Sequence, residues 1–176
     1  MQIILVLLAS LMLISSLSFA QTANDQLQII AVSNALDTAV DAKQWSTAQA
    51  LMTTDIELSL PGQNTRTTTA KDLIEMWSTN LYEGKPSFHL RGNHVVKFSN
   101  TDTAVVRSKA YAWNKIEAFQ GGQLWEVWGD YEYKMVKTNQ GWKIASFKFT
   151  PTHQRGNTRI PAYVPPQLQS SETADN

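Results

Sequence analysis

Cysteine is absent from the 176-residue sequence, so disulfide bonds, thiol nucleophiles and thiolate metal sites are excluded. A lipoprotein anchor is excluded as well, because its lipid is attached to a cysteine. The domain must therefore be held together by its core alone. A hydrophobic content of 43% in a chain of this length is ample for one core.

Histidine is also scarce. Three histidines are present, and none has the spacing to a carboxylate that a helical zinc site requires, so the sequence predicts no metal site. His94 follows His89 by five positions, which on a regular strand places the two side chains on opposite faces. The sequence has no Gly-rich phosphate loop, no Ser-His-Asp order and no Gly-x-Ser-x-Gly elbow, and we expect no cofactor.

Net charge is absent too, since 15 basic side chains balance 15 acidic ones. The basic residues are scattered singly apart from a small group near the C-terminus. No net field therefore exists to attract nucleic acid or an anionic membrane. The sequence predicts no nucleic-acid partner.

Residues 1–20, MQIILVLLASLMLISSLSFA, have the pattern of a signal peptide, although the start of the segment carries no Lys or Arg. An apolar run at 3–13 is followed by small residues at Ser18 and Ala20, which predicts cleavage between Ala20 and Gln21. The alternative is an uncleaved anchor, but the run is shorter than the roughly 20 apolar residues that a membrane span needs. We therefore expect a periplasmic or secreted protein with no membrane contact after cleavage.

The first part of the mature chain has the periodicity of helices. Residues 26–43 carry apolar side chains on one helical face, and Ser46 is placed to begin a short second helix. Residues 55–60 alternate as a half-buried strand does, whereas 63–69 reads as a loop. Thr69 is placed to cap a third helix.

From Phe88 the apolar residues recur with a period of two. This pattern predicts strands at 88–98, 103–115, 122–137 and 142–150. Long strands joined by short turns form an antiparallel sheet that must twist and curl. We therefore predict an α+β domain over residues 21–150, with a cone-shaped, strongly curved antiparallel sheet and N-terminal helices packed on one face. After Pro151 the alternation stops, and a Pro-rich, extended or disordered tail is expected at 151–176.

Three local strings resemble the SnoaL-like branch of the nuclear transport factor 2-like superfamily, which includes polyketide cyclases and scytalone dehydratase. They are LDTAVDAKQWSTAQALMTTDIEL, with an Asp followed two residues on by a basic residue and then a Trp, FHLRGNHVV, with a His-x-x-Gly segment, and GDYEYKMVKTNQGWKIASF, which resembles a closing hairpin. The resemblance implies a cystatin-like roll whose pocket opens at the wide end. The superfamily also contains ketosteroid isomerases and members without catalytic activity, so the fold does not select the function.

The resemblance assigns Asp41 and His89 to positions that hold a water or act as acid and base in dehydratase-like members. A carboxylate that accepts a proton from one imidazole nitrogen raises the basicity of the other. The alternative is structural, with Asp41 ending a helix and His89 forming a hydrogen bond at a strand start. Two pocket tyrosines and a second histidine of the dehydratases fall here at Val40, Leu60 and Asn114. Carbonyl polarisation of the scytalone type is therefore not expected.

Other pocket candidates lie on the predicted sheet. Asn114 either orients a substrate oxygen or serves as a turn residue. The strand at 122–137 has a charged face and an apolar face, and we expect the charged face to lie outside, near a dimer contact. The opposite arrangement would give a polar pocket suited to general-base chemistry. Our predicted pocket residues are Asn114, Trp113, Trp128, Glu132 and Trp77.

These observations lead to two hypotheses. The first is an exported, homodimeric SnoaL-like domain that binds a small hydrophobic or aromatic molecule in its cone. Its enzymatic version is a cofactor-independent lyase or isomerase with Asp41 and His89 as proton carriers. The second is a non-catalytic binding or assembly module with a vestigial pocket. The distance between the two side chains distinguishes them, because acid-base chemistry needs them within about one water-bridged hydrogen bond.

Overall fold

The computed structural model describes residues 2–169, and it describes side chains from residue 22 onward. Its elements in chain order are α1 (Gln2–Asp41), α2 (Trp45–Ala50), β1 (Met52–Ser59), β2 (Arg66–Thr69), α3 (Ala70–Asn80), β3 (Ser87–Phe98), β4 (Thr103–Lys115), β5 (Leu124–Thr138), β6 (Gly141–Gly156) and a short 3-10 helix (Pro166–Leu168). Helices and short strands thus precede four long strands, as the change in periodicity predicts.

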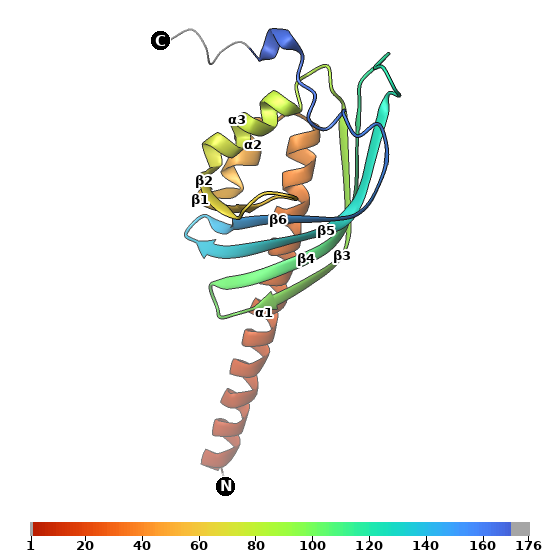
Figure 1. Ribbon diagram of the computed structural model, residues 1–176. Helices are drawn as coiled ribbons and strands as arrows, with labels where there is room; N and C mark the ends of the chain where they lie inside the picture. The colour runs from red at the N-terminus through yellow and green to blue at the C-terminus, as the bar shows by residue number, and fades with distance from the viewer. Residues whose placement is uncertain (1, 170–176) are drawn as a thin grey trace.

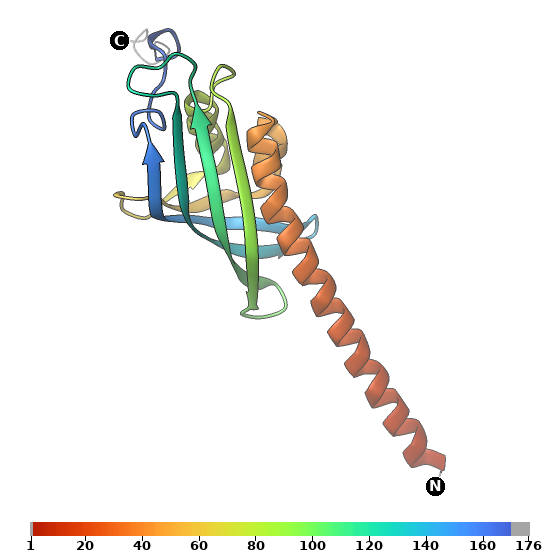
Figure 2. The ribbon, with the colours of Figure 1, turned by 90° about the vertical axis from the view of Figure 1, so that its right-hand side faces the viewer.

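The six strands form one sheet in the order β2-β1-β6-β5-β4-β3. All neighbours are antiparallel except β1 and β6, which pair in parallel. Figure 1 shows the long strands bending strongly, with α2 and α3 together on one side of the sheet. Figure 2 shows α1 running beside β3 and extending well beyond the sheet at its N-terminal end. The predicted α+β architecture with a curved sheet is confirmed.

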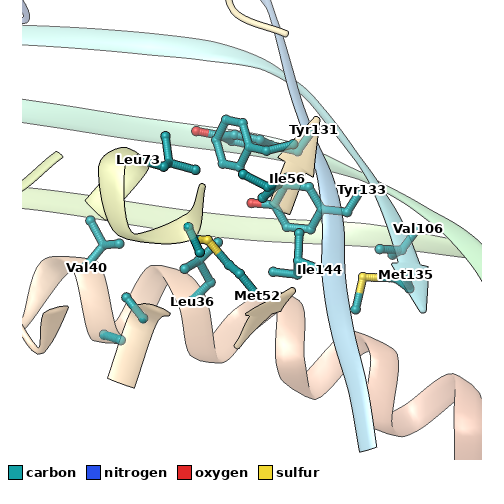
Figure 3. Packing of buried hydrophobic residues seen from close by; sticks show 14 of the residues in the cluster. Leu36, Val40, Met52, Ile56, Leu73, Val106, Tyr131, Tyr133, Met135 and Ile144 are labelled. Carbon is teal, nitrogen blue, oxygen red and sulfur yellow. The ribbon is translucent and has the colours of Figure 1, made fainter. Parts of the chain in front are cut away.

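The core lies between α1 and the inner face of the sheet. Ile29, Leu36 and Val40 of α1, which share one helical face, are all buried. They pack with residues of the strands such as Tyr133 and Ile144, each 1% exposed or less, as Figure 3 shows for part of the cluster. Burial of this apolar face fixes α1 along β3 and so positions the last turn of the helix.

Helix α1 ends in a Schellman motif. The backbone N–H of Gln44 donates to the carbonyl of Ala39 at 2.8 Å, and the N–H of Lys43 donates to that of Val40 at 3.1 Å. Lys43 has φ of 56°, a left-handed conformation in which glycine is the usual residue. This stop places Asp41 in the final turn, next to the start of β3.

Two local predictions differ from the structure near β1. Residues 66–69, expected to be part of a loop, form strand β2 and pair with β1, since a run of β-branched threonines favours extended backbone. Helix α2 begins at Trp45, before Ser46, and its N-cap residue Gln44 makes no side-chain cap. Thr69, by contrast, caps α3 by accepting a hydrogen bond from the Asp72 N–H at 3.0 Å.

The sheet also continues past the predicted end of the domain. Strand β6 runs to Gly156, with Pro151 opposite Gly129 at a bulge, where the missing proline N–H is tolerated. Ile160 is then fully buried, and the carbonyls of Pro161 and Tyr163 accept hydrogen bonds from the Lys85 ammonium at 3.0 and 3.2 Å. Residues 151–163 therefore belong to the folded domain. Residues 170–176 of the expected tail lie outside the described residues.

Candidate functional site

A cavity of about 280 Å³ lies between the helices and the inner face of the sheet. Most of its wall is apolar, with aromatic side chains from α3 and the long strands. These aromatic residues are Trp77, Trp125, Tyr131, Phe147 and Phe149. Four lining residues carry charged or amide groups, namely Asp37, His89, Arg91 and Asn114. The composition suits a small apolar molecule with few polar contacts.

Small residues in the middle of the sheet leave room for this cavity. Ala112 on β4 lies between His89 on β3 and Val127 on β5, and all three side chains point inward. At Gly129 a Cβ atom would lie 2.5 Å from the Thr150 carbonyl oxygen and 2.7 Å from the Phe149 ring. The absence of a side chain there allows the Phe149 ring to pack closely against the sheet and form part of the wall.

Asp41 and His89 are joined by two contacts. Nδ1 of His89 lies 2.7 Å from Oδ1 of Asp41, and the backbone N–H of His89 donates to Oδ2 at 2.7 Å. The hydroxyl of Ser87 also donates to Oδ1, at 2.8 Å. Because Nδ1 is held by the carboxylate, the proton of the neutral ring lies on Nδ1 and the lone pair lies on Nε2. No hydrogen-bond partner for Nε2 occurs among the described residues.

The carboxylate is stabilised in its charged form. Burial alone would raise the pKa of Asp41, but the hydrogen bonds from His89 and Ser87 outweigh burial and hold that pKa below its ordinary value. The Lys43 ammonium donates to the Ser87 hydroxyl at 3.2 Å, which extends the chain of hydrogen bonds to the end of α1. Burial lowers the pKa of Lys43, and the charges of Asp41 and Glu83 oppose that shift.

A second ion pair lies one turn earlier along α1. Arg91 donates from Nη2 to Asp37 Oδ1 at 2.7 Å and from Nε to Oδ2. Its guanidinium lies over the rings of Tyr131 and Tyr133, 3.8 and 4.6 Å from their centroids. Burial alone would lower the pKa of Arg91, yet that pKa is raised because these neighbours favour the charged form. Burial also raises the pKa of Tyr131 to about 12, so its hydroxyl stays protonated.

The two pairs follow from matching repeats in the sequence. Asp37 and Asp41 are four residues apart, which on a helix is a rise of about 6 Å. His89 and Arg91 are two residues apart, which on a strand is a rise of about 6.6 Å. With α1 beside β3, two acidic groups therefore face two basic ones. The sequence motifs predicted only the Asp41–His89 pair, and no local pattern marked Asp37 and Arg91 as partners.

The prediction that His89 and His94 face opposite sides is wrong. A bulge shifts the pairing of β3 between Gly92 and Val95, and Asn93 has φ of 53°. The extra residue reverses the alternation, so His94 points inward as His89 does. Burial and the charge of Arg91 lower the pKa of His94, and its Nε2 is buried with no hydrogen-bond partner among the described residues.

The predicted pocket residues divide between the two faces of the sheet. Trp77 on α3 and Asn114 on β4 line the cavity. Trp113, Trp128 and Glu132 do not, because Ala112, Asn114 and Val127 are the inward residues and side chains alternate along a strand. The pocket assignment of those last three residues is therefore corrected to the outer face.

Contacts on the outer face account for these residues. Trp113 stacks on Phe88 with 5.9 Å between ring centroids, and Trp128 lies 5.0 Å from Tyr111. Glu132 forms an ion pair with Arg107. The charged face of β5 thus lies outside, as we favoured, and the polar pocket of the alternative arrangement is not formed.

Glu126, on the same outer face, is nevertheless buried. It accepts hydrogen bonds from the Tyr111 hydroxyl and from Nε of Arg155, each at 2.8 Å. These bonds lower the pKa of Glu126 and keep it ionised.

In the part of the chain with described side chains, no group of three or more His, Asp or Glu residues is arranged to hold a metal ion.

The match of a family model extends over residues 21–148 and is to the SnoaL-like domain. The chain therefore belongs to the SnoaL-like domain family, within the nuclear transport factor 2-like superfamily. No curated protein sequence matches this chain.

This chain aligns with solved structures of the same fold over nearly the full length of those structures. The Kfla4162 protein from Kribbella flavida aligns with a TM-score of 0.75 and 21% identity over 81% of this chain and 99% of its own. A scytalone dehydratase-like protein from Novosphingobium aromaticivorans has a TM-score of 0.71 and 16% identity. The alignment covers 79% of this chain and 91% of that protein. A hexachlorocyclohexane dehydrochlorinase, LinA type 2, has a TM-score of 0.61 and 18% identity. The alignment covers 82% of this chain and 98% of that protein. These similarities establish the fold, which is of the cystatin-like kind.

Proposed function

We propose that this protein is a cofactor-independent lyase or isomerase that removes a proton from a small hydrophobic or aromatic molecule held in the cavity. The observation that carries the proposal is the 2.7 Å contact between Nδ1 of His89 and Asp41. This contact leaves Nε2 as the basic atom of a residue that lines the cavity. The 2.7 Å separation is well within the distance that acid-base chemistry requires.

Each side chain has a definite role in this reaction. His89 takes the proton at Nε2, and the imidazolium that forms is stabilised by the ionised Asp41. The bonds from Ser87 and from the His89 backbone hold the carboxylate in place. Aromatic side chains form much of the surrounding wall, so a bound substrate would displace water from the pair and strengthen these interactions. Return of the proton to another carbon gives an isomerase, and its transfer to a departing group gives a lyase.

Structural neighbours support the lyase version. One is named as a dehydrochlorinase and another is scytalone dehydratase-like, and both names describe the removal of a small molecule from a substrate. Neither name identifies a substrate for this chain. The tyrosine positions of the dehydratases are occupied by Val40 and Leu60, which line the cavity with apolar groups.

The rival is a binding module in which Asp41 only joins α1 to β3. The bonds of Asp41 to the backbone of His89 and to Ser87 fit that role as well. The two functions differ in what happens when His89 loses its basicity but keeps its size. The variant His89→Gln makes that change.

The test incubates the purified protein and His89→Gln with a small-molecule extract of the host's culture, followed by mass spectrometry. A lyase replaces one compound by a lighter one, and an isomerase produces a new compound of equal mass. We expect either change with the wild type and none with His89→Gln, although both bind the compound. Equal conversion by both proteins, or retention without conversion by both, would support the rival.

We propose further that the chain is exported and cut between Ala20 and Gln21. The family match begins at residue 21, the first residue after the cut. The part of α1 that lies beyond the sheet contains the segment that would be removed (Figure 2). Among residues with described side chains, no helix combines the length and hydropathy that crossing a membrane requires. Intact-mass analysis of protein from the periplasm or medium should give the mass of 21–176.

We also propose a homodimer that forms through the outer face of the sheet. Phe88, Leu90 and Val95 on edge strand β3 and Leu124 on β5 are among the exposed large apolar residues, and all four face outward. A second copy would cover this surface. Sedimentation should give a dimer for the wild type and a monomer for Phe88→Glu, whereas Asn139→Glu in an exposed turn should remain dimeric. A monomeric wild type would contradict the dimer.

A further inference from the structure

His94 lies at a break in the regular pairing of edge strand β3. In the bulge between Gly92 and Val95, two residues, Asn93 and His94, lie opposite the single residue Ser108 of β4. Asn93 is exposed and has φ of 53°, a left-handed conformation that costs free energy for a residue other than glycine. The chain therefore uses a strained residue to turn the His94 side chain inward.

The interior provides no hydrogen bond for one nitrogen of the His94 ring. Nε2 is buried and has no partner among the described residues. Buried polar groups in folded proteins are almost always hydrogen-bonded, so this position of the ring is a costly one. Ser108, the residue opposite the bulge, is buried and carries no charge that could stabilise a protonated ring. The inward position therefore suits a neutral histidine.

The charged and titratable groups around His94 come from three elements. Arg91 on β3 and Asp37 on α1 form the ion pair described above, with side chains 2% and 10% exposed. Tyr131 and Tyr133 on β5 lie under the Arg91 guanidinium, and burial raises the pKa of both, so they stay neutral. Burial and the charge of Arg91 lower the pKa of His94, and the charge of Asp37 opposes that shift. Because Asp37 is already paired with Arg91, it compensates a second cation poorly.

The backbone beside His94 has room to move without disturbing the rest of β3. Gly92 has no side chain, and a Cβ atom there would meet nothing within 4 Å. As the edge strand, β3 forms its ladder with β4 alone. Beyond the bulge, Val96 and Phe98 pack against the core, and the Phe98 ring contacts Trp142 with 6.1 Å between centroids. A rearrangement confined to residues 92–94 therefore brings the His94 ring to solvent while the register of the strand beyond is kept.

We propose that the bulge at 92–95 is a pH-sensitive switch, in which protonation of His94 drives the ring out of the interior and loosens β3 beside α1. Inside, an imidazolium would be a second buried cation next to Arg91. Outside, water solvates it fully. The opened bulge also admits water to the Asp37–Arg91 pair. His94 is not among the described residues that line the cavity, so the switch does not depend on the acid-base function proposed above.

The direction of the pH effect follows from proton binding. The pKa of His94 in the closed bulge lies below its ordinary 6.5, so the closed state binds fewer protons than the opened state. The stability of the closed bulge is therefore complete above pH 6.5 and is lost as the pH falls toward the lowered pKa. A residue that does not titrate at position 94 removes this dependence.

The test measures amide hydrogen exchange of the purified protein at about pH 7.5 and about pH 5.5, within the range in which histidine changes its charge. Exchange is expressed as protection factors, which remove the intrinsic effect of pH on the exchange rate. We expect the paired amides of residues 90–96 to lose protection in acid while those of β5 keep theirs. His94→Leu, which keeps an inward side chain without a titrating group, should retain protection at both pH values. His153→Gln, which removes an exposed histidine of β6, should lose protection as the wild type does.

A second readout follows the ring itself. In ¹H–¹³C spectra the His94 ring should acquire the chemical shifts of a solvent-exposed imidazolium, with the same midpoint as the loss of protection. Unchanged protection in the wild type would overturn the proposal, as would a loss that spreads at once through the whole sheet. Loss of protection in His94→Leu would also overturn it, because that variant still carries His89. If His94→Leu does not fold, His94→Gln takes its place, since its side chain is polar but takes up no charge.

Discussion

The carboxylate of Asp41 holds both the ring and the backbone of His89, with Nδ1 and the backbone N–H each 2.7 Å from one of its oxygens. A single side chain at the end of α1 therefore fixes the position, the rotamer and the tautomer of a residue on β3. The same bonds connect a helix to the edge of the sheet. Structural and chemical roles coincide in this pair, and experiments must separate them.

Acid should weaken the fold through Asp41. Its pKa in the folded protein lies below the ordinary 3.8, so the folded state binds fewer protons than the unfolded state. The stability that Asp41 contributes is therefore complete above that ordinary value and is lost as the pH falls through the folded pKa. In urea unfolding, the wild type should exceed Asp41→Asn in stability at neutral pH, and the difference should shrink in acid. A difference that is independent of pH would contradict this account.

The pair of Asp37 and Arg91 should show strong coupling. Removing one partner leaves the other charge buried and unpaired, which typically costs about 3–5 kcal/mol. Asp37→Leu and Arg91→Met should each destabilise the protein strongly, whereas the double variant that combines these two substitutions should be less damaging than the sum, by about 1–3 kcal/mol. A double-mutant cycle by urea unfolding measures the coupling. Simple additivity would mean that the pair contributes no interaction energy.

Filling the cavity should abolish ligand binding. Ala112 lies between His89 and Val127 on the inner face, so Ala112→Leu projects into the cavity. Ala104 lies on the same face of β4, is 2% exposed and does not line the cavity, so Ala104→Leu is a matched control. Ala104→Leu should cost about 1–3 kcal/mol by overpacking a filled site, whereas Ala112→Leu enters open space and should cost less. Titration with indane should show binding to Ala104→Leu but not to Ala112→Leu, and binding to both would place the ligand elsewhere.

Lys85 should make the stability depend on pH in the alkaline range. Burial lowers the pKa of Lys85 from 10.5 to about 8, with a further contribution from the charge of Lys43. Between these two values the folded protein binds fewer protons than the unfolded chain, so stability relative to Lys85→Met rises with pH. Urea unfolding of both proteins across this range measures the difference. A constant difference would show that Lys85 titrates alike in both states.

Local chemistry made much of the fold predictable. The helical spacing of Ile29, Leu36 and Val40, the cap at Thr69 and the alternation from Phe88 onward each specify local structure that the tertiary fold retains. The family strings then brought Asp41 and His89 together as candidates. These signals depend on neighbours in sequence, and burial reinforces them.

Other features depend on tertiary contacts that no local pattern encodes. The bulge at Asn93 inserts one residue and brings His94 inward, and the close packing of Phe149 depends on the absence of a side chain at Gly129. Aromatic residues such as Trp113 and Trp128 suit a pocket wall or an outer surface equally well. The structure decides between these two locations through Asn114, whose side chain points into the cavity. Because side chains alternate along β4, the neighbouring Trp113 then points outward.

The tautomer of His89 tests the central claim most directly. Long-range ¹H–¹⁵N correlation spectra of the neutral ring distinguish a proton on Nδ1 from one on Nε2. The account predicts protonated Nδ1 and unprotonated Nε2 in the wild type, with the proton moving to Nε2 in Asp41→Asn. A wild-type ring that carries its proton on Nε2 would have no basic atom toward the cavity, and the role of His89 as a base would be contradicted.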